Sequence, residues 1–211
     1  MPGMSMAAET GYHAAAGYLG MWLAMMVPMM LPSLIPMLAR YRRSLRGAGG
    51  IQLHGLTLLA GVGYFAVWAA LGMAAYTAGV GLMAVGMRWT AAGRWLPVGA
   101  AVVLLLAGLV QFTAWKAEQL AHCRDGGTCC PAPLPTALGA LRHGVELGVL
   151  CSLCCGSLML ALVATGMMNV PAMIAVTVAV SAERLAPAPV RIARLSGVAI
   201  LVVGALMIAR A

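Results

Sequence analysis

Long runs of apolar residues alternate along the chain with short segments that carry most of the charged residues. An α-helix needs about 20 apolar residues to cross a bilayer, and six of the runs are suited to this. We therefore predict an all-α fold, a polytopic transmembrane helical bundle that forms one integral membrane domain. The predicted spans cover roughly residues 17–39, 53–79, 97–115, 144–166, 168–182 and 195–209.

The fourth and fifth spans are expected to form a tight helical hairpin. Between positions 144 and 182 the only charged residue is Glu146. At about 1.5 Å per residue, one helix of that length would be nearly twice as long as the membrane core is thick. Gly166, Asn169 and Pro171 interrupt helices, so they mark the predicted turn.

Composition excludes an ordinary soluble domain. Hydrophobic residues make up 63 % of the chain and charged residues 9 %, whereas soluble proteins have about 25 % charged residues. The net charge is +8, but the basic residues lie at the ends of apolar runs. They indicate membrane topology there and give no reason to expect a nucleic acid partner. Ten of the 13 Lys and Arg residues lie in the odd-numbered connections, which predicts a cytoplasmic location for these loops and both termini outside.

Methionine is abundant, with 17 residues in the chain and six in the first predicted span. Met21, Met25 and Met29 repeat every four residues, which places them on one helix face. Three prolines in the same span should kink or loosen the helix, because each removes a backbone hydrogen bond. The methionines either fill gaps in a core or provide weak thioether ligands for a soft metal.

The fourth predicted span carries Cys151, Cys154, Cys155 and Met159. Their spacing places all four side chains within a sector of about 140° on a helix. Thiolates and thioethers are the ligands that select Cu(I), whereas a Zn²⁺ site more usually takes four ligands with His or carboxylate partners. The cysteines can also be small packing residues, and residues 151–154 have the C-x-x-C spacing of redox thiols.

A polar segment after the third span contains His122 and Cys123, followed by Cys129 and Cys130. These residues are candidates for a second metal clamp. A disulfide and idle thiols are the alternatives, and the predicted cytoplasmic location favours reduced thiols.

Polar side chains near the span ends are further candidates, because ionisable groups at membrane depth are costly and often functional. The set comprises Gln111, Lys116, Glu146, Asn169 and Glu183. Asn169 is most simply a turn residue, although its side chain has an oxygen that can act as a ligand.

Several segments resemble, in order, motifs of a bacterial family of predicted metal-binding integral membrane proteins that has no established activity. Residues 22–28 match its Trp-x-x-Met-Met-x-Pro opening, and residues 148–159 match its Gly-x-x-Cys-x-x-Cys-Cys-x-x-Leu-Met stretch. The other matches are Gln111, Lys116, Cys123-Arg124, the Gly-x-Met-Asn sequence at 166–169, and Glu183. The resemblance implies a polytopic membrane protein that handles metal.

Together these observations predict a soft-metal protein of the bacterial inner membrane, with Cu(I) as the expected metal and Zn²⁺ or another soft metal as the alternative. We expect metal transfer or delivery rather than enzymatic activity, since no hydrolase or phosphate-binding motif is present. Methionines of the first span would form a path of weak sites for the metal, and the tight site would consist of Cys151, Cys154 and Cys155. The metal would be received or released at the loop thiols Cys123, Cys129 and Cys130. A metallochaperone or a copper enzyme is the expected partner. A membrane thiol redox protein and an assembly subunit of a membrane complex remain alternatives.

Overall fold

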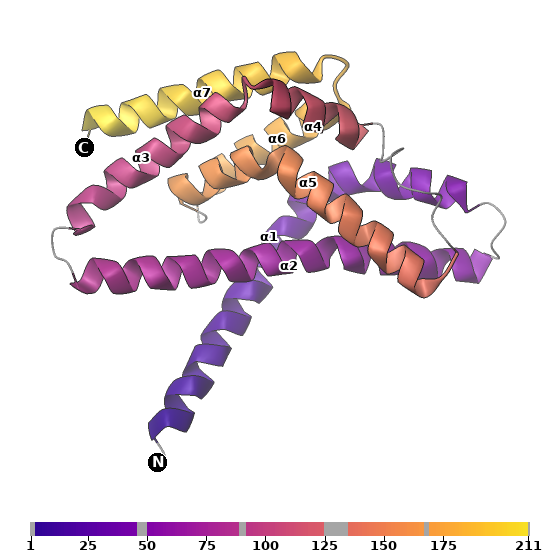
Figure 1. Cartoon of the computed structure of the whole chain (residues 1–211), viewed down its shortest axis with the longest axis horizontal. Helices are drawn as coiled ribbons and strands as arrows, with labels where there is room; N and C mark the ends of the chain where they lie inside the picture. Colours follow the sequence, from indigo (N-terminus) through magenta and orange to yellow (C-terminus); the bar gives the residue numbers. More distant parts are fainter. Residues whose placement is uncertain (1–2, 46–49, 89–91, 125–134, 167–168, 211) are drawn as a thin grey trace.

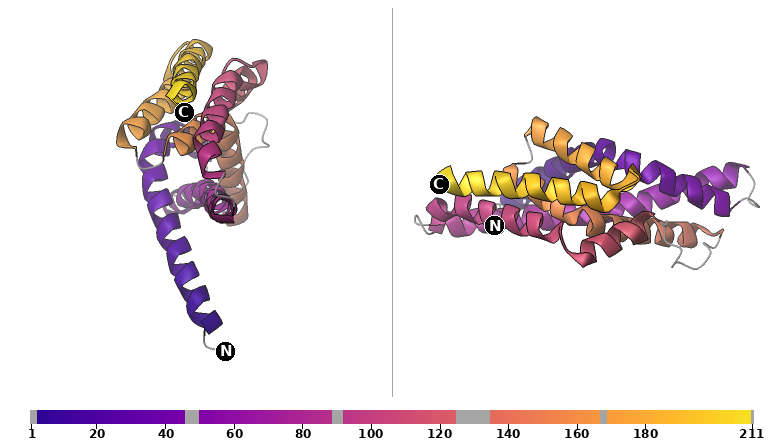
Figure 2. Two further views of the ribbon diagram at one scale, coloured as in Figure 1. Left: turned by 90° about the vertical axis from the view of Figure 1, so that its left-hand side faces the viewer. Right: turned by 90° about the horizontal axis from the view of Figure 1, so that it is seen from above.

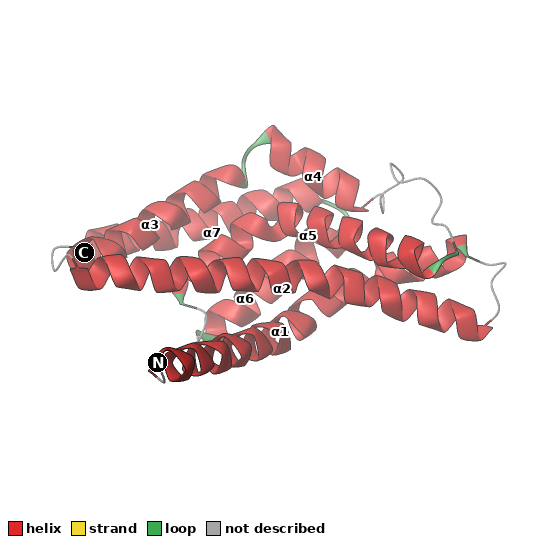
Figure 3. Cartoon of the chain, turned by 60° about the horizontal axis from the view of Figure 1, so that its bottom comes forward, coloured by secondary structure: helices red, strands yellow, loops and turns green. Residues whose placement is uncertain are grey.

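The structure, a computed structural model, describes residues 3–45, 50–88, 92–124, 135–166 and 169–210. These residues form an all-helical bundle without a strand, as the sequence predicts (Figures 1 and 3). The helices are α1 (Gly3–Ser44), α2 (Gly50–Arg88), α3 (Ala92–Val110), α4 (Ala114–Arg124), α5 (Ala137–Thr165), α6 (Val170–Leu185) and α7 (Pro189–Arg210).

Four of these helices are long and apolar enough to cross a membrane: Tyr12–Ser44, Gly50–Ala84, Ala137–Thr165 and Pro189–Ala209. A fifth is added if α3 and α4 count as one broken span, since they meet at an angle of 67°. The predicted third span, 97–115, is therefore interrupted after Val110. The predicted fifth span corresponds to α6, whose 16 residues are fewer than the roughly 20 needed to cross a bilayer.

α1 is one continuous helix with Pro28, Pro32 and Pro36 inside it. Its ribbon changes direction part-way along, and its N-terminal part extends away from the other helices (Figures 1 and 2). Such a bend is the expected effect of prolines inside a helix, which remove backbone hydrogen bonds and crowd the preceding turn.

The turn between α5 and α6 agrees with the predicted breakers. Gly166 follows the last residue of α5 with a φ of +98°, a conformation that favours glycine. Asn169 caps α6, since its side-chain oxygen accepts a hydrogen bond of 3.1 Å from the Ala172 amide.

Glycines allow α2 and α5 to pack with their backbones almost in contact. A Cβ atom added to Gly144 would lie 2.0 Å from the Ala60 carbonyl oxygen, and one added to Gly63 would lie 2.4 Å from the Leu141 carbonyl oxygen. Small residues at such crossings are typical of helix pairs in membranes. This packing fixes the position of α5, which carries three of the cysteines, against α2.

Candidate metal centre

The three cysteines of α5 face the main core of the bundle. Cys151, Cys154 and Cys155 are each at most 1 % exposed, as their common helix face suggests. The Sγ atoms of Cys151 and Cys155 are 4.0 Å apart, and the Cys155 thiol also donates a 2.9 Å hydrogen bond to the Cys151 carbonyl. Met159 is buried in the same core.

α1 brings a methionine to these thiols. The Sδ atom of Met30 lies 4.0 Å from Cys151 Sγ, and Met30 is completely buried. Of the predicted methionine face, Met29 is buried, Met25 is partly buried and Met21 is 45 % exposed. The structure thus places Met30, one residue beyond that face, next to the cysteines.

Tyr64 of α2 completes this part of the site. Its buried hydroxyl donates a 2.9 Å hydrogen bond to Cys151 Sγ. A hydroxyl donor directed at sulfur stabilises the thiolate relative to the thiol. The thiolate is the form that binds metal.

Cys123 also belongs to this centre, although it was expected to act with the following loop. It lies near the end of α4 and is 4 % exposed, and its thiol donates a 3.2 Å hydrogen bond to the Leu150 carbonyl of α5. Its neighbour His122 is exposed and its Nδ1 atom lies 2.8 Å from the Glu118 carbonyl oxygen. Cys129 and Cys130 lie outside the described residues. The predicted clamp is therefore divided, with Cys123 inside the bundle and His122 outside it.

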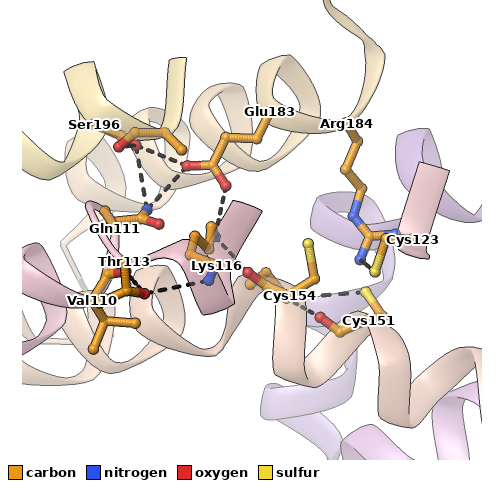
Figure 4. Close-up of polar contacts among 12 residues, drawn as sticks. Val110, Gln111, Thr113, Lys116, Cys123, Cys151, Cys154, Glu183, Arg184 and Ser196 are labelled. Atoms are coloured by element: carbon orange, nitrogen blue, oxygen red, sulfur yellow. Dashed lines mark hydrogen bonds and ion pairs between the residues drawn. The ribbon is translucent and has the colours of Figure 1, made fainter. Parts of the chain in front are cut away.

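Arg184 of α6 enters the same region from the opposite side (Figure 4). Its two terminal nitrogens lie 3.6 Å from Cys123 Sγ and 3.8 Å from Met37 Sδ. The side chain is 8 % exposed, and its Nε atom has no hydrogen-bond partner. In the part of the chain that the structure describes, no carboxylate forms an ion pair with it. The buried sulfur-containing side chains of this region are called the sulfur cluster below; they are Met30, Met37, Cys123, Cys151, Cys154 and Cys155.

A buried ion pair lies beside the sulfur cluster (Figure 4). Lys116 Nζ is 2.8 Å from Glu183 Oε2, and it donates a 2.5 Å hydrogen bond to the Cys154 carbonyl. The other carboxylate oxygen of Glu183 accepts hydrogen bonds from Gln111 (3.0 Å) and Ser196 (2.8 Å). The network joins the α3–α4 bend to α5, α6 and α7.

Three of the five predicted polar candidates thus meet in one network, and the other two lie elsewhere. Glu146 pairs with Arg142 at 3.0 Å, and Arg142 is 79 % exposed. Asn169 caps α6, which is the simpler role that the sequence offered.

Sequence reasoning missed Arg184 and Tyr64. Arg184 closes an apolar segment, a position from which arginine side chains commonly reach the membrane surface, whereas α6 directs it into the bundle. One available signal was its neighbour Glu183, because two adjacent opposite charges at the end of one short helix point in different directions, about 100° apart. Nothing in the sequence distinguishes Tyr64 from other tyrosines.

Among the described residues, no three His, Cys, Asp or Glu side chains are grouped so that they could hold a metal ion. The donors that do converge are the two thiols of Cys151 and Cys155 and the thioether of Met30. Such a mixed set suits a soft monovalent ion better than Zn²⁺.

Comparison with known proteins agrees with this donor chemistry. No curated protein and no solved structure matches the chain. A family model described as PpoB2, copper chaperone, matches residues 19–207. The matched region extends from α1 to α7 and contains every member of the sulfur cluster. The chain therefore belongs to the PpoB2 copper chaperone family.

Proposed function

We propose that the protein is an integral membrane chaperone that binds Cu(I) at the sulfur cluster and delivers it to a copper protein. The observation that carries this proposal is the convergence of Cys151 Sγ with Cys155 Sγ and Met30 Sδ, each 4.0 Å away, in a completely buried place. Metal–thiolate bonds are about 2.3 Å long. An ion bound to two sulfurs 4.0 Å apart would therefore have a sulfur–metal–sulfur angle of about 120°. That angle is the one a three-coordinate site requires.

The charge around the cluster supports a monovalent ion. One Cu(I) with two thiolates and a thioether carries a net charge of −1. A buried charge needs a partner, and Arg184 is a buried cation without a carboxylate partner among the described residues. Zn²⁺ with the same ligands would be neutral and would leave the guanidinium uncompensated.

Delivery requires ligands that release the ion as well as bind it. Cys123 Sγ and Met37 Sδ both lie beside the Arg184 guanidinium, and Cys123 is also hydrogen-bonded to α5 at the Leu150 carbonyl. Stepwise exchange among these donors would move Cu(I) from Cys151 and Cys155 to Cys123. Each step replaces one metal–sulfur bond by another and leaves the copper oxidation state unchanged.

Membrane integration rests on the four long apolar helices and on their outward-facing side chains. Leu58 of α2, Leu160 of α5 and Leu195 of α7 are 72 %, 55 % and 70 % exposed. Exposed apolar surface of this extent is unfavourable in water but normal against lipid tails. With the α3–α4 pair and α6 both counted as spans, the excess of basic residues in the odd-numbered connections supports an orientation with both termini outside.

The test is the copper content of the detergent-purified protein after anaerobic addition of Cu(I). Wild type should retain about one Cu(I) per chain, and the C151S/C154S/C155S variant should retain far less. Met30→Leu and Met21→Leu form a matched pair, because both remove a thioether but only Met30 touches a cysteine. Unchanged copper content in the triple variant, with normal folding, would contradict the proposal.

One observation favours thiol redox chemistry as a second candidate. Cys123 and Cys154 come from different helices, α4 and α5, which are joined by the hydrogen bond from the Cys123 thiol to the Leu150 carbonyl, whereas Cys151 and Cys155 are one turn apart on one helix and less suited to a disulfide. Oxidation of the Cys123–Cys154 pair would pass two electrons and two protons to a partner disulfide. Titration of free thiols before and after mild oxidation, compared with the Cys123→Ser variant, distinguishes this reaction from copper binding.

A further inference from the structure

A pocket of about 200 Å³ opens next to the sulfur cluster, between α1, α4 and α6. Its wall includes Ser33, Met37, Arg40, Cys123, Arg124 and Arg184. It therefore combines three guanidinium groups with a thiol and a thioether that belong to the proposed copper path.

The polar groups of the pocket are arranged to receive a negative charge. Arg40 donates a hydrogen bond to the Arg124 carbonyl, and Arg124 donates one to the Ala186 carbonyl, so the arginines are held around the opening. Inside, Arg184 Nε and Ser33 Oγ are buried and lack hydrogen-bond partners. None of the residues that line the pocket is acidic.

Two unpartnered donors in a cationic pocket favour an oxyanion, and the adjacent sulfurs favour a soft metal. We propose that this pocket docks a small anionic thiol that carries Cu(I), with its carboxylate on the arginines and its metal next to Cys123 and Met37. The inference rests on the function proposed above and specifies the form in which copper reaches or leaves the protein.

The transfer that follows docking is a ligand exchange. The Cys123 thiol loses its proton and forms a bond to Cu(I), while the bond between Cu(I) and the carrier's sulfur breaks. The carrier's thiolate takes up the proton and leaves as a thiol. Copper remains Cu(I) throughout, and Arg184, 3.6 Å from Cys123 Sγ, stabilises the cysteine thiolate during the exchange.

The test compares two copper donors on the purified full chain. One donor is Cu(I)–glutathione, an anionic thiolate complex, and the other is Cu(I) with acetonitrile as its ligand, which carries no negative charge. The variant is Arg40→Gln, which removes a charge from the pocket wall and keeps an amide donor. Arg43→Gln is the matched control, because Arg43 is also exposed, lies on the same helix and does not line the pocket.

Arg40→Gln should slow copper uptake from Cu(I)–glutathione by about three- to tenfold, the scale of one lost charge-assisted contact. Uptake from the acetonitrile complex should be unaffected, and Arg43→Gln should behave as wild type with both donors. Equal effects of Arg40→Gln on both donors, or equal effects of the two arginine variants, would overturn the docking site. No uptake by wild type from either donor would instead overturn copper binding itself.

A second measurement needs no copper. S-methylglutathione, which cannot bind Cu(I) as a thiolate, should bind the metal-free protein in equilibrium dialysis and should bind Arg40→Gln less tightly. The single variant Ser33→Ala should also bind S-methylglutathione less tightly than wild type, since Ser33 Oγ lies unpartnered in the pocket wall. Equal binding to wild type and both variants would contradict an anion site at this place.

Discussion

The Lys116 ammonium and the Glu183 carboxylate are 2.8 Å apart, and both side chains are 1 % exposed. This pair holds α4 against α6, and through the Cys154 carbonyl it also holds α5. The position of the sulfur cluster therefore depends on charged residues that contribute no sulfur.

We predict that Lys116→Met alone destabilises the protein severely. Removal of one partner leaves an uncompensated buried charge, which costs about 3–5 kcal/mol. The double variant K116M/E183M should recover much of the loss, because it buries no charge. Thermal unfolding in detergent measures both, and a double variant less stable than either single variant would be inconsistent with this explanation.

The exposed pair of Arg142 and Glu146 provides the control. Its members are 79 % and 34 % exposed at an N–O distance of 3.0 Å, and pairs of this kind contribute only about 0.3–0.5 kcal/mol. Glu146→Gln should therefore leave the unfolding temperature close to that of wild type.

Gly144→Ala should disrupt the packing of α2 against α5. The added Cβ would lie 2.0 Å from a backbone oxygen of Ala60, so the helices would have to separate. Gly156→Ala is the matched control on the same helix, since nothing lies within 4 Å of its Cβ position, and alanine favours a helix by about 1 kcal/mol over glycine. We expect poor folding in the first variant and equal or greater stability in the second, as judged by monodispersity and unfolding temperature. The reverse order would contradict the close crossing.

Tyr64→Phe should weaken Cu(I) binding while the protein remains folded. The substitution removes the 2.9 Å hydrogen bond to Cys151 Sγ and keeps the aromatic ring in the core. A lost hydrogen bond to a charged acceptor corresponds to about 1.5–3 kcal/mol, or about tenfold or more in affinity. Competition with a chromophoric Cu(I) chelator measures the change.

Tyr12→Phe serves as its control, because Tyr12 is 76 % exposed. Equal affinities of the two tyrosine variants would show that the hydroxyl of Tyr64 has no role at the metal.

The sequence predicts some of this arrangement well because helical geometry is local. The spacing of Cys151, Cys154 and Cys155 places them on one face, and Gly166 with Asn169 indicates the end of α5. The limits come from contacts between helices. Which of several methionines meets the cysteines depends on the rotation and bending of α1, and no local pattern determines that.

Two further features depend on tertiary packing in the same way. The break after Val110 lies in an apolar segment without a proline nearby, and it turns Cys123 inward against α5. Arg184 resembles a membrane-surface arginine in sequence, but the direction of α6 buries it beside that thiol. A loop clamp with His122 was the natural expectation as long as the chain was considered one segment at a time.

X-ray absorption at the copper edge tests the central claim most directly. Wild-type protein loaded with Cu(I) should show a coordination shell made only of sulfur, at about 2.3 Å, with a signature of three ligands. The C151S/C155S variant should lose that shell or the bound copper. A shell dominated by nitrogen or oxygen in wild type, or an unchanged sulfur shell in the variant, would contradict copper binding at the sulfur cluster.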